Sequence, residues 1–286
     1  MSVTILDGPL GTQLNAHGLE TPAPLWSAAA LRSHPQLVQR IHRAYADAGA
    51  QVHTANTFRT RRRSAGAQWR ELAEEAIRLA RAALPPGATL AGSIAPLEDC
   101  YRPDRSPPAP GAEHAELAAA LAALGCDLLL CETFPHVGEG LAAVSAAVAT
   151  GLPTWAAFTA GYRADLLTPG ALAQAAREAE ARGAQAVLVN CVPASQTLRY
   201  VRALADSGIQ VPFGAYANAG HPTEGLGWVS TDDGPARYAA LAQGWVDAGA
   251  TLVGSCCGTG PDTIAALARC FQTHDAPTGS AGASAS

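Results

Sequence analysis

Two adjacent cysteines, Cys256 and Cys257, form the part of the sequence with the clearest capacity for chemistry. They follow the apolar run 250–253, and Gly254 and Gly258 flank them. Successive side chains of a strand point to opposite faces, so both thiols reach one point only if the chain leaves strand geometry there, which flanking glycines permit. Two buried cysteines without a chemical role are one interpretation. The other is a pair of thiolate ligands for a metal ion at the end of a strand.

A third ligand should come from the end of another strand, and Cys191 follows the apolar run 186–190. Three thiolates suit Zn²⁺, and three protein ligands leave one position open, as in catalytic zinc sites. Two alternatives remain, namely a closed structural site with His221 as fourth ligand and a Cys191 that belongs only to the core. A zinc ion with three thiolate ligands activates water poorly but keeps a substrate thiol deprotonated and nucleophilic. The ligand set therefore predicts thiol alkylation and disfavours hydrolysis.

The composition is that of a large globular chain without strong charge bias. The 286 residues are 48% hydrophobic and 15% charged, with a formal net charge of −5. This mild acidity gives no reason to expect nucleic acid or an anionic membrane as a partner. Residues 1–10 show no signal-peptide pattern, and no apolar run is long enough to span a bilayer. The seven cysteines are odd in number and irregularly spaced, which predicts a reducing, cytoplasmic location and thiol or metal chemistry instead of disulfides.

Eight short apolar runs, each followed by an alanine-rich amphipathic stretch, organise the chain. The predicted strands are 3–7, 50–54, 89–94, 127–131, 153–158, 186–190, 211–215 and 250–254, and the predicted helices are 35–48, 69–84, 113–124, 137–149, 169–182, 195–206, 235–248 and 261–271. A glycine-rich turn over 8–12 and an irregular segment precede the first helix. The pattern predicts a single-domain (β/α)8 TIM barrel over 1–272, ahead of an open doubly wound sheet, with a flexible low-complexity tail over 273–286.

The active site of such a barrel lies at the carboxyl ends of its strands, where this sequence is rich in polar residues. Asp7 and Glu132 are available to bind a substrate ammonium group, and backbone amides of the 8–12 turn are available to bind a carboxylate. Structural roles are the alternatives: a turn or cap for Asp7, an ion pair for Glu132, and backbone bracing for Asn56 and Asn190. The run 61–63, three arginines, is interpreted as a solvated surface.

Together these residues carry a resemblance to a known family. The motifs are Asp7-Gly8-Pro9-Leu10-Gly11-Thr12, Thr54-Ala55-Asn56-Thr57-Phe58, Gly92-Ser93-Ile94, Glu132-Thr133, Val189-Asn190-Cys191 and Gly254-Ser255-Cys256-Cys257-Gly258-Thr259. They resemble the homocysteine S-methyltransferase family, whose members are zinc-dependent (β/α)8 barrels, and the match extends from Asp7 to about Phe271. The resemblance implies that Cys191, Cys256 and Cys257 bind zinc and that the Asp7 loop and Glu132 hold homocysteine. The predicted substrate-binding residues are Asp7, Gly8, Thr12, Asn56, Thr57, Ser93, Glu132 and Asn190.

The sequence thus predicts an enzyme that moves a methyl group from a sulfonium donor, S-methylmethionine or S-adenosylmethionine, to homocysteine and forms methionine. A betaine-type donor, another thiol or selenol acceptor, and a non-catalytic thiol-binding module that serves a separate methyl carrier are the alternatives. The expected partners are these small molecules. Loops 100–111 and 217–233 are expected at the barrel mouth, where the donor enters.

Overall fold

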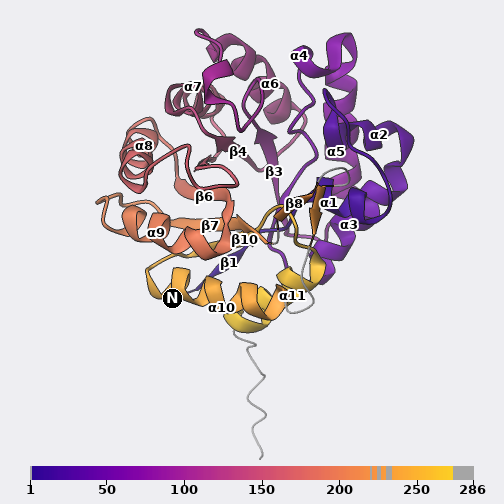
Figure 1. Ribbon diagram of the computed structural model, residues 1–286. Coiled ribbons are helices and arrows are strands. Elements are labelled where there is room, and N and C mark those ends of the chain that lie inside the picture. The colour runs from indigo at the N-terminus through magenta and orange to yellow at the C-terminus, as the bar shows by residue number, and fades with distance from the viewer. Residues whose placement is uncertain (1, 220, 224–226, 230–233, 273–286) are drawn as a thin grey trace, which may run out of the picture.

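Eight parallel strands form the central sheet of the computed structural model, which describes residues 2–219, 221–223, 227–229 and 234–272. In spatial order they are β1 (Thr4–Ile5), β10 (Leu252–Ser255), β7 (Phe213–Asn218), β6 (Ala186–Pro193), β5 (Thr154–Phe158), β4 (Leu128–Phe134), β3 (Thr89–Ile94) and β2 (Val52–Thr54). Each predicted strand corresponds to one of these, and the strands occupy the centre of the molecule (Figure 1).

The sheet closes on itself between its two outer strands, β1 and β2. Leu6 and Val52 form a parallel bridge. The N–H of Asp7 donates to the carbonyl oxygen of Val52 at 2.9 Å, and the N–H of Gln51 donates to that of Ile5 at 2.8 Å. These bonds complete a barrel, so the predicted (β/α)8 fold is confirmed and an open doubly wound sheet is excluded.

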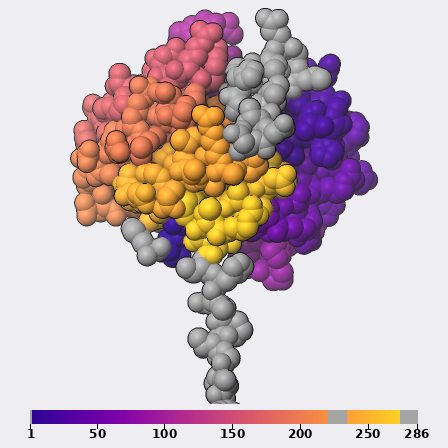
Figure 2. All heavy atoms as spheres, turned by 60° about the horizontal axis from the view of Figure 1, so that its bottom comes forward, coloured from indigo at the N-terminus to yellow at the C-terminus, as the bar shows by residue number. Residues whose placement is uncertain are grey.

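A ring of helices surrounds the barrel, and each packs against the next (Figure 1). The ring consists of α3 (Pro35–Asp47), α5 (Trp69–Ala83), α6 (Gly111–Ala123), α7 (Val137–Val148), α8 (Pro169–Ala181), α9 (Ala194–Ala205), α10 (Gly234–Asp247) and α11 (Pro261–Phe271). Contacts between α11 and α3 close the ring, and in Figure 2 the yellow C-terminal surface borders the indigo and violet N-terminal part. In the part of the chain that the structure describes, no helix has the length and apolarity needed to cross a membrane.

Short elements occupy several of the connections at the barrel mouth. They are α1 (Leu10–Ala16), η1 (Trp26–Ala29), α2 (Ala30–Ser33), α4 (Arg62–Ala65), η2 (Gly66–Gln68), η3 (Pro103–Arg105) and an antiparallel pair, β8 (His221–Thr223) and β9 (Gly227–Val229). The predicted tail 273–286 and parts of the predicted 217–233 loop lie outside the described residues.

The strands are apolar on both faces because each face meets a different apolar layer. One layer fills the barrel interior and includes Leu130, Leu188 and Leu252, and the other lies between the sheet and the helices. The approach of β7 to β10 requires a glycine, since a Cβ on Gly214 would lie 1.8 Å from the Leu252 carbonyl oxygen. The tightly packed barrel interior therefore fixes the positions of the strands, and with them the positions of the residues at their carboxyl ends.

Two local predictions at the mouth are wrong. Helix α1 occupies the end of the expected 8–12 turn and the start of the expected irregular segment. It begins after the extended residue Pro9 and buries Leu14 completely in the core. Gly254 does not form a turn but lies in β10, where a Cβ would come within 2.7 Å of the Leu6 Cβ. Gly258, with φ of 81°, provides the left-handed conformation of the turn instead.

Candidate active site

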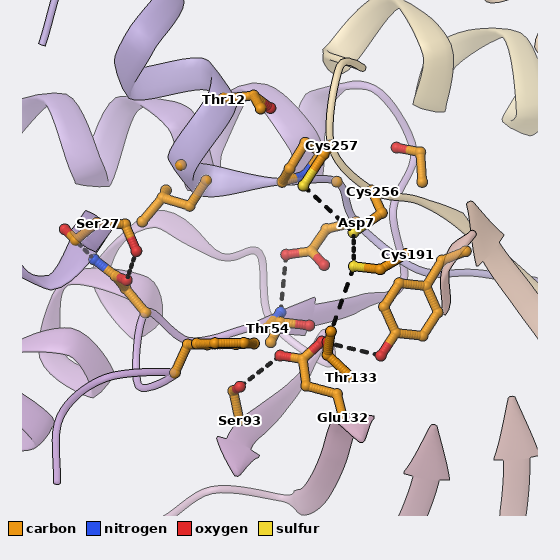
Figure 3. Close-up of a pocket in the computed structure, with 18 of the residues that line it drawn as sticks. Asp7, Thr12, Ser27, Thr54, Ser93, Glu132, Thr133, Cys191, Cys256 and Cys257 are labelled. Carbon is orange, nitrogen blue, oxygen red and sulfur yellow. Dashed lines mark hydrogen bonds between the residues drawn. The ribbon is translucent and has the colours of Figure 1, made fainter. Parts of the chain in front are cut away.

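A cavity of about 370 Å³ opens at the carboxyl ends of the strands (Figure 3). Residues from β2, β3, β4, β6, β7 and β10, from helices α1 and α3, and from the segments that follow the strands line it. The lining includes the thiol groups of Cys191, Cys256 and Cys257, the carboxyl groups of Asp7 and Glu132, and the rings of Trp26, Phe58, Tyr101 and Tyr216. Its position agrees with the general location of active sites in (β/α)8 barrels.

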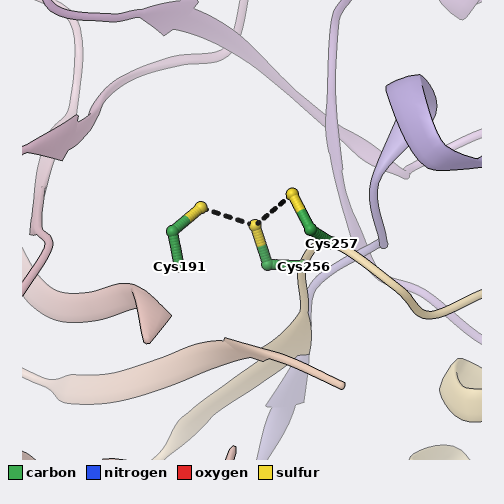
Figure 4. Close-up of side chains that lie close together, drawn as sticks. All are labelled: Cys191, Cys256 and Cys257. Atoms are coloured by element: carbon green, nitrogen blue, oxygen red, sulfur yellow. Dashed lines mark hydrogen bonds between the residues drawn. The ribbon is translucent and has the colours of Figure 1, made fainter. Parts of the chain in front are cut away.

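The three predicted metal ligands converge at this cavity (Figure 4). The sulfur of Cys256 lies 2.7 Å from that of Cys191 and 4.0 Å from that of Cys257. All three sulfurs lie within 4.8 Å of one another. Zn–S bonds of about 2.3 Å place the sulfurs of a tetrahedral site roughly 3.8 Å apart, a value that the two measured separations bracket.

Electrostatics also favours a cation among the thiols. Hydrogen bonds with Cys191 and Cys256 hold the pKa of Cys257 well below its ordinary value. The hydrogen bond with Cys256, followed by that with Cys257, raises the pKa of Cys191 well above its ordinary value. Three such close thiols cannot all ionise unless a positive charge compensates them, which a divalent metal ion would do. The donor set therefore fits a metal ion with soft ligand preference.

The backbone at the end of β6 is shaped to aim Cys191 inward. The β6–β7 register shifts between Asn190 and Pro193, and Cys191 has φ of 51°. A similar shift ends β4, where Thr133 has φ of 63°. Asn190 Nδ2 donates to Thr133 Oγ1 at 2.7 Å and lies 3.8 Å from the Cys191 sulfur. These contacts brace two strained strand ends and place hydrogen-bond donors beside one sulfur.

Two buried carboxyl groups lie next to the thiols. Asp7 Oδ2 accepts a hydrogen bond from the N–H of Thr54 at 2.8 Å, and burial raises the pKa of Asp7 to about 8 with a smaller contribution from Glu132. Glu132 accepts hydrogen bonds from the hydroxyl groups of Ser93 and Tyr216, the latter at 3.0 Å, and burial raises its pKa as well. Neither carboxyl group forms an ion pair with another described residue, so this part of the cavity favours a positively charged group.

The other predicted substrate-binding residues divide into two groups. Gly8, Thr12, Asn56 and Ser93 line the cavity, and the Thr12 hydroxyl is buried without a hydrogen-bond partner among the described residues. The Asn56 amide is engaged by Ser27, through bonds of 2.7 and 2.9 Å. Thr57 and Asn190 are not among the lining residues. Thr57 Oγ1 donates to the Ser93 carbonyl oxygen and accepts from the Ser93 N–H, each at 2.9 Å. These contacts favour bracing roles for Thr57 and Asn190, and their predicted contact with substrate stays a prediction.

Sequence reasoning missed the half-buried rings of Trp26, Phe58 and Tyr101, here called the aromatic wall. The rings of Trp26 and Phe58 stack with centroids 5.7 Å apart. The three residues lie in loops far apart in the chain, and Trp26 belongs to the segment expected to be irregular. No periodic pattern marks such residues, and only the position of Phe58 directly after the Asn56-Thr57 motif provided a signal.

The interpretation of 61–63 as a solvated run is wrong for Arg61, which is only 3% exposed. Its guanidinium donates to backbone carbonyl groups, whereas Arg62 and Arg63 are exposed and pair with glutamates. The side chain of His221, the alternative fourth ligand, lies outside the described residues.

The chain is similar to known proteins over almost its whole length. The family model described as homocysteine S-methyltransferase matches residues 4–271. A homocysteine S-methyltransferase of Escherichia coli is 32% identical, over 93% of this chain and 94% of that protein. Homocysteine S-methyltransferase 4 of Zea mays is 30% identical, over 94% of this chain and 89% of that protein. The metallated form of the homocysteine methyltransferase MmuM from Escherichia coli superposes with a TM-score of 0.78 at 27% identity, covering 93% of this chain and 96% of that one.

Proposed function

The chain belongs to the homocysteine S-methyltransferase family, and we propose that it transfers a methyl group from a sulfonium donor to homocysteine at a zinc ion held by Cys191, Cys256 and Cys257. The observation that carries this proposal is the convergence of the three thiols within 4.8 Å, in a cavity also lined by Asp7 and Glu132. The preferred donors are S-methylmethionine and S-adenosylmethionine, and the second product is the corresponding thioether.

The three thiol groups define where the acceptor sulfur binds. Cys191, Cys256 and Cys257 would hold the zinc ion, and the ion would supply the positive charge that keeps a substrate thiol deprotonated and nucleophilic. Asn190 and Thr133 place an amide donor 3.8 Å and a hydroxyl group 3.9 Å from the Cys191 sulfur, which fixes that ligand and disperses part of its negative charge.

Asp7 and Glu132 orient the amino-acid part of homocysteine. Its ammonium group supplies the positive charge that the two buried carboxyl groups do not find among the described residues, and this lowers their pKa values relative to the substrate-free protein. The Thr12 hydroxyl and the cavity-lining backbone beside Gly8 are available for its carboxylate. We call Asp7, Glu132 and the three cysteines the acceptor side of the cavity.

The aromatic wall faces the same cavity. The Arg59 guanidinium already covers one face of the Trp26 ring, 4.0 Å from its centroid, and lies 5.5 Å from the centroid of Phe58, so a cationic donor would use ring faces that Arg59 does not cover. The faces of aromatic rings attract a sulfonium or quaternary ammonium group by their quadrupole. Transfer breaks the bond between the methyl carbon and the donor sulfur and forms a bond to the acceptor sulfur. The electron pair of the broken bond stays on the donor sulfur, which leaves as a neutral thioether. The step neutralises charge and needs no general acid, so the protein's part is in-line placement and exclusion of water.

The test incubates the zinc-loaded protein and homocysteine with S-methylmethionine, S-adenosylmethionine or betaine and measures methionine. Formation of methionine with a sulfonium donor supports the proposal. Formation of methionine with betaine alone would show that the donor is a quaternary ammonium compound instead. Selenocysteine or a thiol other than homocysteine, with the methylated acceptor measured as product, tests the acceptor. No product with any pair would contradict the enzyme and favour a thiol-binding module that serves a separate methyl carrier.

A further inference from the structure

The buried guanidinium of Arg61 joins two loops of the cavity wall. Its Nη1 donates to the carbonyl oxygens of Phe58, at 3.2 Å, and Ala95, at 3.0 Å. Its Nη2 donates to the carbonyl oxygens of Leu97, at 3.0 Å, and Pro96. A buried cation is stable only where polar groups replace its water, and these four carbonyl groups come from the segments after β2 and after β3. The four carbonyl groups can replace the water around Arg61 only if the two loops keep their positions relative to each other.

Glu139, in the first turn of α7, holds the same segment from the other side. Its Oε1 accepts a hydrogen bond from the N–H of Leu97 at 2.7 Å and lies 3.3 Å from His114 Nε2. Burial by itself raises the pKa of Glu139, but hydrogen bonds, chiefly from His114 and the N–H of Leu97, outweigh it and hold that pKa below its ordinary value. The backbone of Leu97 is thus bound at its carbonyl by Arg61 and at its N–H by an ionised carboxylate. We call Arg61, Glu139 and segment 95–97 the clamp.

Both chain segments that leave the clamp lead to the aromatic wall. On one side is Phe58 itself. On the other, the chain continues to Cys100 and Tyr101, which line the cavity, and the Tyr101 ring packs edge-on against Tyr162 with centroids 5.1 Å apart. The acceptor side, by contrast, is carried by β1, β4, β6 and β10 and receives no hydrogen bond from Arg61 or Glu139 among the described residues.

We propose that Arg61 is a positioning residue for the methyl donor: by joining the loops after β2 and β3 it holds the aromatic wall in register with the acceptor sulfur. This inference rests on the proposed function. Methyl transfer requires the donor carbon in line with the attacking sulfur, and displacement by about 1 Å costs on the order of 10²-fold in rate. Loosening the clamp therefore impairs the donor while leaving the metal and homocysteine in place.

The first test compares Arg61→Met and Arg61→Lys with Arg62→Met. Arg62 is the matched control because its exposed guanidinium pairs with Glu116 on the surface. We expect Arg61→Met to raise the donor KM and lower kcat by about tenfold or more each, with zinc content and homocysteine KM within twofold of the parent. Lysine keeps the charge but lacks the planar fork that reaches four carbonyl groups, so Arg61→Lys should show a smaller shift of the same kind.

The second test measures how accessible the loop after β3 is to a thiol reagent, and it does not depend on enzymatic activity. Cys100 is 3% exposed, and burial raises its pKa to about 12, so it alkylates slowly in the parent. Release of the clamp should expose it. In zinc-loaded Arg61→Met, iodoacetamide should label Cys100 about tenfold faster, as measured by peptide mass spectrometry, while Cys126, buried beside β4, keeps its rate and Arg62→Met changes neither.

Three results would overturn the inference: donor kinetics of both Arg61 variants equal to those of Arg62→Met, unchanged labelling of Cys100, or equal losses of donor and homocysteine affinity together with zinc. If Arg61→Met does not fold, Arg61→Lys carries both measurements. A parent protein that methylates nothing with any donor contradicts the proposed function instead, and the labelling of Cys100 still decides whether the clamp holds the loop.

Discussion

The acceptor side and the aromatic wall are built by different means. The acceptor side stands at the ends of β1, β4, β6 and β10, where the hydrogen-bonded sheet fixes its cysteines and carboxyl groups. The wall stands on loops, and side-chain bonds to the backbone from Arg61, Glu139 and Thr57 hold those loops. Under the proposed function, the sulfur chemistry depends on the strand ends, and donor recognition depends on the loops above them. Substitutions on one side should therefore affect one substrate and spare the other.

The largest effect is expected from the metal ligands. Cys257→Ser exchanges a soft thiolate for a mostly protonated hydroxyl, so zinc affinity should fall by more than about 10³-fold and methyl transfer should stop. Zinc content by atomic absorption checks this, with circular dichroism to show that the barrel core still folds. Cys270→Ser is the control, because Cys270 is exposed on α11. Retained zinc in Cys257→Ser, or a nitrogen ligand in X-ray absorption that disappears when His221 is replaced, would contradict the three-thiolate site.

The second-largest effect is expected from Glu132→Ala, which should change the KM for homocysteine and leave the KM for the donor unchanged. Loss of a charged partner for the ammonium group costs about 1.5–3 kcal/mol, which raises the homocysteine KM by about 10- to 150-fold. The donor KM and the zinc content should not change. Glu132→Gln loses the charge but keeps one acceptor oxygen for the hydroxyl groups of Ser93 and Tyr216, and its NH2 group can donate to the other hydroxyl group. It should therefore resemble the alanine variant in KM and exceed it in thermal stability. Parental kinetics in both variants would assign Glu132 a structural role only.

Tyr101→Ala tests the aromatic wall. Removal of a ring that faces a cation costs about 0.5–2 kcal/mol, so the donor KM should rise by about 2- to 30-fold while the homocysteine KM stays constant. Tyr101→Phe keeps the ring and should remain within twofold of the parent. A homocysteine KM that rises as much as the donor KM in Tyr101→Ala would show that the division between the sides is not real.

The smallest effect concerns Asp7 and the pH dependence of stability. Its folded pKa of about 8 exceeds the ordinary value of 3.8, so the folded state retains a proton that the unfolded state loses. The stabilisation is complete below the ordinary pKa and is lost as the pH rises toward and through 8. In metal-free, substrate-free protein, the melting temperature should fall between pH 5 and pH 8 by several degrees more in the parent than in Asp7→Asn, which mimics the neutral acid. If the melting temperatures of the parent and of Asp7→Asn fall equally over this pH range, the proton that the folded state retains is not on Asp7.

Local patterns were enough to predict the barrel and the convergence of three cysteines at its mouth. Apolar runs of strand length alternate with amphipathic stretches in sequence, and the carboxyl ends of parallel strands must meet at one mouth, so Cys191 could be assigned to the same site as Cys256 and Cys257. The same reasoning predicted that Asp7 and Glu132 lie at this mouth, and both line the cavity. Strand periodicity does not reveal the register shifts after Cys131 and Asn190, because a single left-handed residue leaves no repeating signal.

The sequence by itself determined which residues end the strands, and therefore the acceptor side, since hydrophobic period and chain order are local properties. Only the tertiary structure decided the aromatic wall and the burial of Arg61. Arg61, Arg62 and Arg63 are chemically identical neighbours, yet one is enclosed by carbonyl groups more than thirty residues away in the chain while the other two reach solvent and surface glutamates. That difference depends on how the loops after β2 and β3 meet above the barrel, and no local pattern specifies such a meeting.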